Sequence, residues 1–186
     1  MDSRDPGPYV LFMGFPSKHD PALLAWLGLR ERVAVEAGAL QMPEFAALSD
    51  PSASNDPSDP GAPSAPGADD WIGIWRLLAP NNREIGRSAF IYGSFEVAQA
   101  NVTFLKHSAA ELTPISFHGP TGGMHGWYVA LEGRLVFTCA RWYETGQMSL
   151  EAAAGAIQAI SGAFVSRGPH QFSGRRRTRP SELSSR

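Results

Sequence analysis

The stretch Trp75–Ser88, WRLLAPNNREIGRS, decides the organisation of the second half of this chain. Its apolar start has the composition of a β-strand, and Asn81-Asn82 can adopt the positive φ that a tight hairpin turn needs. The second strand runs on to Tyr92, and Ser94 is then placed to cap a helix. The stretch therefore predicts a strand, a hairpin, a second strand and a helix, in that order.

The same order of elements recurs further along the chain. The segment Trp127–Tyr143, WYVALEGRLVFTCARWY, again has two apolar runs, separated here by Glu132-Gly133. If three extra residues are allowed after the second strand, Ser149 takes the place of Ser94 as the helix cap. A repeated order of elements indicates an internal repeat. We predict one unit over Trp71–Lys106 and a second over Trp127–Val165.

A further strand precedes the second unit. Leu112–His118 alternates apolar and polar residues, so the full unit is three antiparallel strands and a helix. The first unit has no strand directly before Trp71, and Tyr9–Phe15, YVLFMGF, is our candidate for that place. The expected fold class is α+β, an antiparallel sheet with helices on one face, built from a duplicated β-β-β-α unit.

Composition divides the chain into four regions. Residues 1–48 are expected to hold a strand and a helix, the helix capped by Asp20 and starting at Pro21. Residues 49–70 are all Pro, Gly, Ser, Ala, Asp or Asn, so they cannot bury apolar surface and read as a disordered linker. Residues 71–166 form the duplicated domain, and residues 167–186 read as a disordered basic tail.

The Trp75–Ser88 run, followed by Tyr92 and by a helix that begins at Ser94, resembles the YegP-like family. These are small bacterial proteins of unknown function, commonly built from tandem repeats of three strands and a helix. The second unit keeps Gly133-Arg134 and Tyr143. It has Glu132 where the family usually has asparagine. The resemblance covers residues 71–165 and implies a fold, and the family has no established catalytic residues to transfer.

Charge is segregated along the chain. The whole chain of 186 residues carries −2, whereas residues 175–186 carry +4, so the remainder carries −6. The basic tail could contact the phosphates of a nucleic acid without reading sequence, although the acidic body opposes this. A solubilising tail is the alternative. The candidate phosphate contacts are Arg175, Arg176, Arg177 and Arg179.

Several features favour the cytoplasm. Cys139 is the single cysteine, so no internal disulfide can form, which fits a reducing compartment. No apolar run approaches the ~18 residues of a membrane helix, and the first residues lack the layout of a secretory signal. We expect a cytoplasmic protein with no membrane partner.

The glycine-rich loop Gly119–Gly126 is flanked by His118 and His125. A metal site usually needs three or four ligands, and the chain has no cysteine pair and no HExxH pattern, so we expect no metal. The loop joins two strands and lacks the Lys-Ser/Thr of a phosphate loop, so a flexible hairpin is the better interpretation. It remains the loop best suited to contact a small-molecule ligand.

The sequence does not support catalysis. Cys139 lies in the middle of an apolar strand, where a buried small hydrophobe is expected rather than a nucleophile. No GxSxG motif and no conspicuous pair of carboxylates is present. We expect no catalytic residue and no cofactor, and we leave enzymatic activity open.

Aromatic residues are concentrated in the predicted strands. One face of the sheet must meet the helices, so a core position is the default for Trp75 and Trp127. If they lay on the open face instead, they could form a binding platform together with Tyr143, His118 and His125.

These observations predict a non-enzymatic cytoplasmic module that binds a protein partner or self-associates through strand edges or an aromatic face. The alternatives are an accessory nucleic-acid binder that uses the arginine tail, and a small-molecule binder at the Gly119–Gly126 loop.

Overall fold

A computed structural model describes residues 7–36, 71–119 and 122–171. The predicted linker at 49–70 lies outside the described residues, as do the tail arginines Arg175, Arg176, Arg177 and Arg179. In chain order the elements are β1 (Tyr9–Phe15), α1 (Pro21–Glu36), β2 (Ile72–Leu78), β3 (Glu84–Ser88), α2 (Phe95–His107), a 3-10 turn (Ala109–Glu111), β4 (Thr113–His118), β5 (His125–Leu131), β6 (Arg134–Cys139), α3 (Gly146–Gly162), β7 (Phe164–Val165) and β8 (His170–Gln171).

The strands form one sheet in the order β4-β5-β6-β3-β2-β1-β7, and β8 also pairs with β1. Neighbouring strands from β4 to β1 are antiparallel. The short strands β7 and β8 run parallel to β1. The protein is therefore α+β with a predominantly antiparallel sheet.

Strand β1 belongs to the same sheet as the strands that follow residue 70. It pairs with β2 over its whole length, from Tyr9 opposite Leu78 to Phe15 opposite Ile72. The hypothesis that Tyr9–Phe15 occupies the place before the Trp71 strand is confirmed. The N-terminal strand is thus part of the same sheet as the rest of the chain.

The two halves of the sheet share an internal arrangement. In each half a tryptophan indole on the middle strand donates to a tyrosine hydroxyl, from Trp75 to Tyr92 at 3.1 Å and from Trp127 to Tyr143 at 3.2 Å. The same tyrosines form isolated backbone bridges, to Gly73 and to His125. The halves meet where β3 pairs with β6.

The start of α3 differs from the prediction. Thr145 caps this helix by accepting from the amide of Met148 at 3.2 Å, as Ser94 caps α2 through the amide of Val97. Ser149 lies buried inside the helix and donates to the carbonyl of Gly126 at 2.6 Å. The prediction of Ser149 as the cap is therefore wrong. The helix starts earlier because Thr145 already supplies the capping oxygen.

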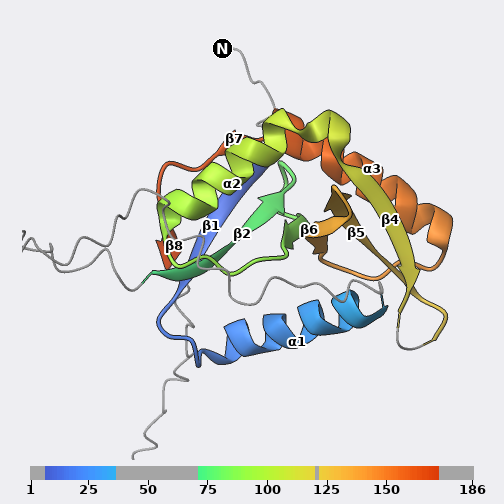
Figure 1. Cartoon of the computed structure of the whole chain (residues 1–186), viewed down its shortest axis with the longest axis horizontal. Helices are drawn as coiled ribbons and strands as arrows, with labels where there is room; N and C mark the ends of the chain where they lie inside the picture. Colours follow the sequence, from blue (N-terminus) through green and yellow to red (C-terminus); the bar gives the residue numbers. More distant parts are fainter. Residues whose placement is uncertain (1–6, 37–70, 120–121, 172–186) are drawn as a thin grey trace, which may run out of the picture.

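The helices lie on both faces of the sheet. Figure 1 shows α2 and α3 on one side and α1 on the other. The α2 and α3 side chains pack over a core that contains Trp75 and Trp127. Residues Leu23 and Trp26 of α1 pack on the opposite face. The prediction of helices on one face is therefore wrong for α1.

α1 packs on the second face of the sheet because both faces of the central strands are apolar. In β5 every position after His125 is buried, which is the pattern of a strand covered on two sides. A strand of this kind needs a second layer, and α1 supplies part of it.

No helix among the described residues is long and apolar enough to cross a membrane.

The two edges of the sheet are protected in different ways. β7 and β8 cover part of the outer edge of β1. β8 falls in the region predicted as a disordered tail, so residues 167–171 belong to the fold instead. At the other edge, β4 contains Pro114, which has no N–H to offer a further strand. Pro114 thus removes one donor from the β4 edge, and β7 and β8 occupy part of the β1 edge.

Candidate functional site

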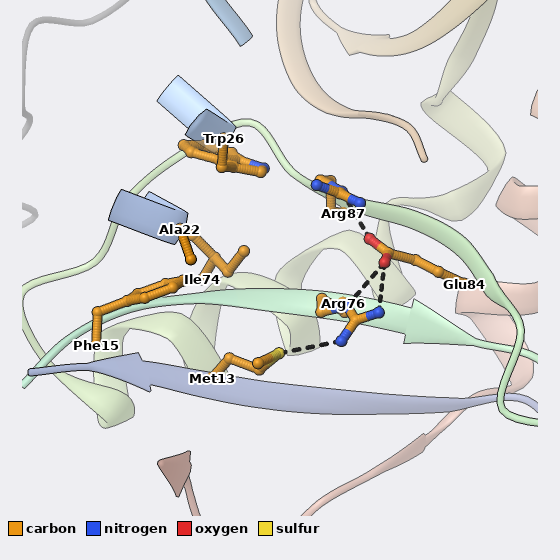
Figure 2. Close-up of a pocket in the computed structure, with 8 residues that line it drawn as sticks. All are labelled: Met13, Phe15, Ala22, Trp26, Ile74, Arg76, Glu84 and Arg87. Atoms are coloured by element: carbon orange, nitrogen blue, oxygen red, sulfur yellow. Dashed lines mark hydrogen bonds and ion pairs between the residues drawn. The ribbon is translucent and has the colours of Figure 1, made fainter. Parts of the chain in front are cut away.

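A cavity of about 170 Å³ lies between α1 and the sheet (Figure 2). α1 supplies its roof, and β1, β2 and β3 supply its walls and floor. The lining residues are Met13, Phe15, Ala22, Trp26, Ile74, Arg76, Glu84 and Arg87. The site is therefore built from two parts of the chain that lie on either side of the predicted linker.

The roof is positioned by the start of α1. As predicted, Asp20 caps this helix, because its carboxylate accepts from the amide of Ala22 at 2.8 Å. Ala22 and Trp26 are four residues apart, so they project from the same face of the helix. Trp26 is buried with 4% of its surface exposed, and its indole faces the cavity.

The floor carries an ion-pair network. Arg76 and Arg87 are opposite each other in the β2–β3 register, so their side chains share a face. Like charges directly opposite on a sheet repel, and Glu84 relieves this by binding both. Its Oε2 accepts from Arg76 Nε at 2.9 Å and Nη2 at 2.5 Å, and its Oε1 lies 2.6 Å from Arg87 Nε.

These charges are largely removed from water. The side chains of Arg76, Glu84 and Arg87 are 30%, 12% and 21% exposed. The contact between Arg87 Nε and Glu84 Oε1 is an ion pair without hydrogen-bond geometry. Among the described residues, the only hydrogen-bond partner of Arg76 Nη1 is the thioether sulfur of Met13, a weak acceptor, at 3.2 Å. The network therefore has donor capacity left over and a net charge of +1.

A third arginine, Arg30, lies on α1 one turn after Trp26. The guanidinium of Arg30 stacks over the Trp26 ring at 5.5 Å, and its Nη1 contacts the carbonyl of Ala89 at 3.4 Å. Burial lowers the pKa of Arg30. Because guanidinium groups remain protonated in proteins, Arg30 adds positive charge near the cavity.

The tryptophans of the predicted binding surface are in the core. Trp75 and Trp127 are both 0% exposed, because their indoles face α2 and α3. The core position expected as the default for Trp75 and Trp127 is therefore confirmed, and the alternative, an aromatic platform on the open face, is wrong for these two residues. Tyr143 is also buried, its hydroxyl bound by Trp127 and its ring covered by the guanidinium of Arg141 at 5.0 Å.

The two loop histidines do come together. His118 is opposite His125 in the β4–β5 pairing, and their ring centroids are 4.5 Å apart. Within the described residues no group of three or more His, Cys, Asp or Glu side chains is arranged to hold a metal. Part of the Gly119–Gly126 loop lies outside the described residues. Its two ends pack against Trp142.

Cys139 is buried, as its strand position predicted. Burial raises the pKa of its thiol. The amide of Trp127 donates to its sulfur at 3.4 Å. The thiol is therefore protected, and it behaves as a small core side chain.

Sequence reasoning missed the arginine-lined cavity. Arg76 and Arg87 stand at the polar positions of two adjacent strands, and this alternation was a usable signal that they share a face. The roof had no comparable signal, because nothing local to α1 indicates which face of the sheet it covers.

Fold and site together define a class: an α+β protein with a sheet covered on both faces and an arginine-lined cavity beneath α1. No family model matches the chain, and no curated protein matches it. Among solved structures, the chain is similar in part to the solution NMR structure of YegP from E. coli, a protein of unknown function. The TM-score is 0.40 at 15% identity, over 56% of this chain and 85% of that one.

Proposed function

We propose that this chain is a non-enzymatic binding protein whose ligand site is the cavity between α1 and the sheet. The observation that carries the proposal is the Arg76–Glu84–Arg87 network, which faces this cavity with donor capacity unused. Buried charges are costly to desolvate, so a partly buried cluster in a cavity is a reasonable binding site.

The chemistry of the lining favours a small organic anion. Guanidinium groups bind carboxylates through paired, charge-assisted hydrogen bonds. The roof residue Trp26 and the strand residue Ile74 are apolar and would contact a hydrophobic body. The described residues of the lining offer guanidinium, carboxylate, indole, thioether and hydrocarbon groups, which suit non-covalent binding of an anion with an apolar body.

The size of the cavity limits the ligand. A protein cavity of about 150 Å³ can hold benzene. The cavity here, about 170 Å³, suits a single ring or a short branched chain with one anionic group. Benzoate is therefore a suitable probe, and benzamide is its neutral counterpart.

Isothermal titration of the full chain with benzoate tests the proposal. We expect one saturable site, and affinity for benzamide at least about tenfold lower because a charged hydrogen bond is worth about 1.5–3 kcal/mol. Arg87→Ala should weaken benzoate binding by about tenfold for the same reason.

Arg83→Ala is the matched control, because it removes the same charge from an exposed position on the same hairpin. It should leave benzoate affinity unchanged. Absence of saturable binding, or an equal loss in both variants, would contradict the proposal.

We also infer that the two halves of the sheet are copies of one β-β-β-α unit. The support is the recurrence of the tryptophan–tyrosine hydrogen bond, the tyrosine bridge and the helix cap at matching places. The cavity is lined by β1–β3 of the first half, whereas α1 also reaches the second half, where Val33 packs with Tyr128 and Leu135.

A further inference from the structure

A second cluster of chemically active groups lies on the β4–β5 hairpin. His118 and His125 are directly opposite in the strand pairing. Their rings are 4.5 Å apart between centroids and tilted by 47°. His118 is exposed and His125 is half-buried, so solvent reaches the pair.

The backbone brings these side chains close. The amide and carbonyl of His125 both bond to Tyr143, at 2.7 and 2.8 Å, so they point away from β4. His118 and His125 therefore form a non-hydrogen-bonded pair, the kind in which cross-strand side chains approach most closely. The next pair outward is closed by the amide of Gly119 donating to Met124 at 2.7 Å. The hairpin holds both imidazoles on one face.

The ring nitrogens are available. Within the described residues, neither imidazole of the pair makes a hydrogen bond, whereas Nδ1 of His107 contacts the carbonyl of Thr103 at 2.7 Å. Gly146, at the start of α3, lies beside His125. A Cβ at that position would come within 3.3 Å of Nδ1, so the glycine keeps this side of the ring uncrowded.

We propose that His118 and His125 form a two-imidazole site for a divalent transition-metal ion. Neutral imidazole is a common ligand for Zn²⁺, Ni²⁺ and Cu²⁺, and the order of affinities across these metals places Cu²⁺ first. Two protein ligands leave the other coordination positions to water or to a second molecule. The site is thus an open one, different in kind from a four-ligand structural zinc site.

Titration of the full chain with Cu²⁺ in a non-coordinating buffer tests this site. We expect one ion per chain, and zinc bound more weakly. His118→Ala and His125→Ala should each reduce Cu²⁺ affinity by about tenfold or more, because each removes one of two ligands.

His107→Ala is the matched control, since it removes an exposed histidine from another element. It should leave Cu²⁺ affinity unchanged. Paramagnetic broadening by Cu²⁺ should affect the ring protons of His118 and His125 before those of His107. An undiminished affinity in His118→Ala, or an equal loss in His107→Ala, would overturn the proposal.

Discussion

Glu84 is the residue on which the proposed ligand site depends. It neutralises one of two arginines that the β2–β3 register places side by side. Removing one member of a partly buried ion-pair network leaves the others uncompensated, and this costs more than the intact network contributes. Glu84 also occupies guanidinium donors that an anionic ligand would use. It should therefore stabilise the fold while competing with the ligand.

Glu84→Gln should separate these two roles. We expect the free energy of unfolding to fall by about 1–3 kcal/mol, less than for a fully buried pair because both arginines keep some contact with water. Benzoate affinity should rise, because the arginines lose their internal anion. Urea unfolding measures the first effect, and calorimetric titration measures the second. Weaker benzoate binding in Glu84→Gln would show that the ligand does not share these donors.

Individual residues were predictable where one local rule decides them. Asp20 as a cap and Cys139 as a buried side chain follow from short-range pattern, and both are confirmed. Ser149 was assigned wrongly because Thr145 offers the same capping chemistry four residues earlier, and the pattern alone does not rank two such oxygens. Ser149 is buried against Gly126 instead, and this contact depends on how α3 packs on the sheet.

Among the secondary-structure elements, β1 contributes most to both the sheet and the cavity. It adds a strand to the first half of the sheet and leads directly into the helix that covers the cavity. Its residue Phe12 is 0% exposed and packs edge-to-face against Phe95 of α2 at 4.9 Å. This strand should therefore unfold together with the rest of the sheet.

Phe12→Ala tests this integration. Loss of a large buried aromatic side chain should lower the free energy of unfolding by about 3–5 kcal/mol. Because β1 belongs to the common sheet, hydrogen exchange should also speed up in β5, in the other half of the molecule. Leu24→Ala, at a half-exposed site on α1, is the control and should have a small effect. Unchanged protection of β5 in Phe12→Ala would mean that the N-terminal strand is only an appended arm.

The order of strands and helices along the chain was predictable from the sequence. The face of the sheet on which α1 packs was not. Period-two alternation and hairpin residues located β2 to β6 because those signals are local. The face that α1 covers, and the pairing of β7 and β8 with β1, depend on contacts between residues far apart in the chain. Local pattern carries little information about such contacts.

In the whole molecule, the cavity exists because two distant segments meet. Met13 and Trp26 come from the N-terminal segment 7–36, and Arg76 and Arg87 from the segment that begins at residue 71. Each of these residues has an ordinary local role, as a strand or helix position. Only the assembled fold places an indole, a thioether and two guanidinium groups around one space, which explains why the site could not be identified from sequence.

The most direct test of the binding account is the indole N–H resonance of Trp26 during a benzoate titration of the full chain. Trp26 lines the cavity, whereas Trp75 and Trp127 lie in the core on the opposite face of the sheet. We predict that the Trp26 resonance shifts and saturates with benzoate, that those of Trp75 and Trp127 stay in place, and that Arg87→Ala greatly weakens the response. A Trp26 resonance that does not move, or that responds equally to benzamide, would contradict the account.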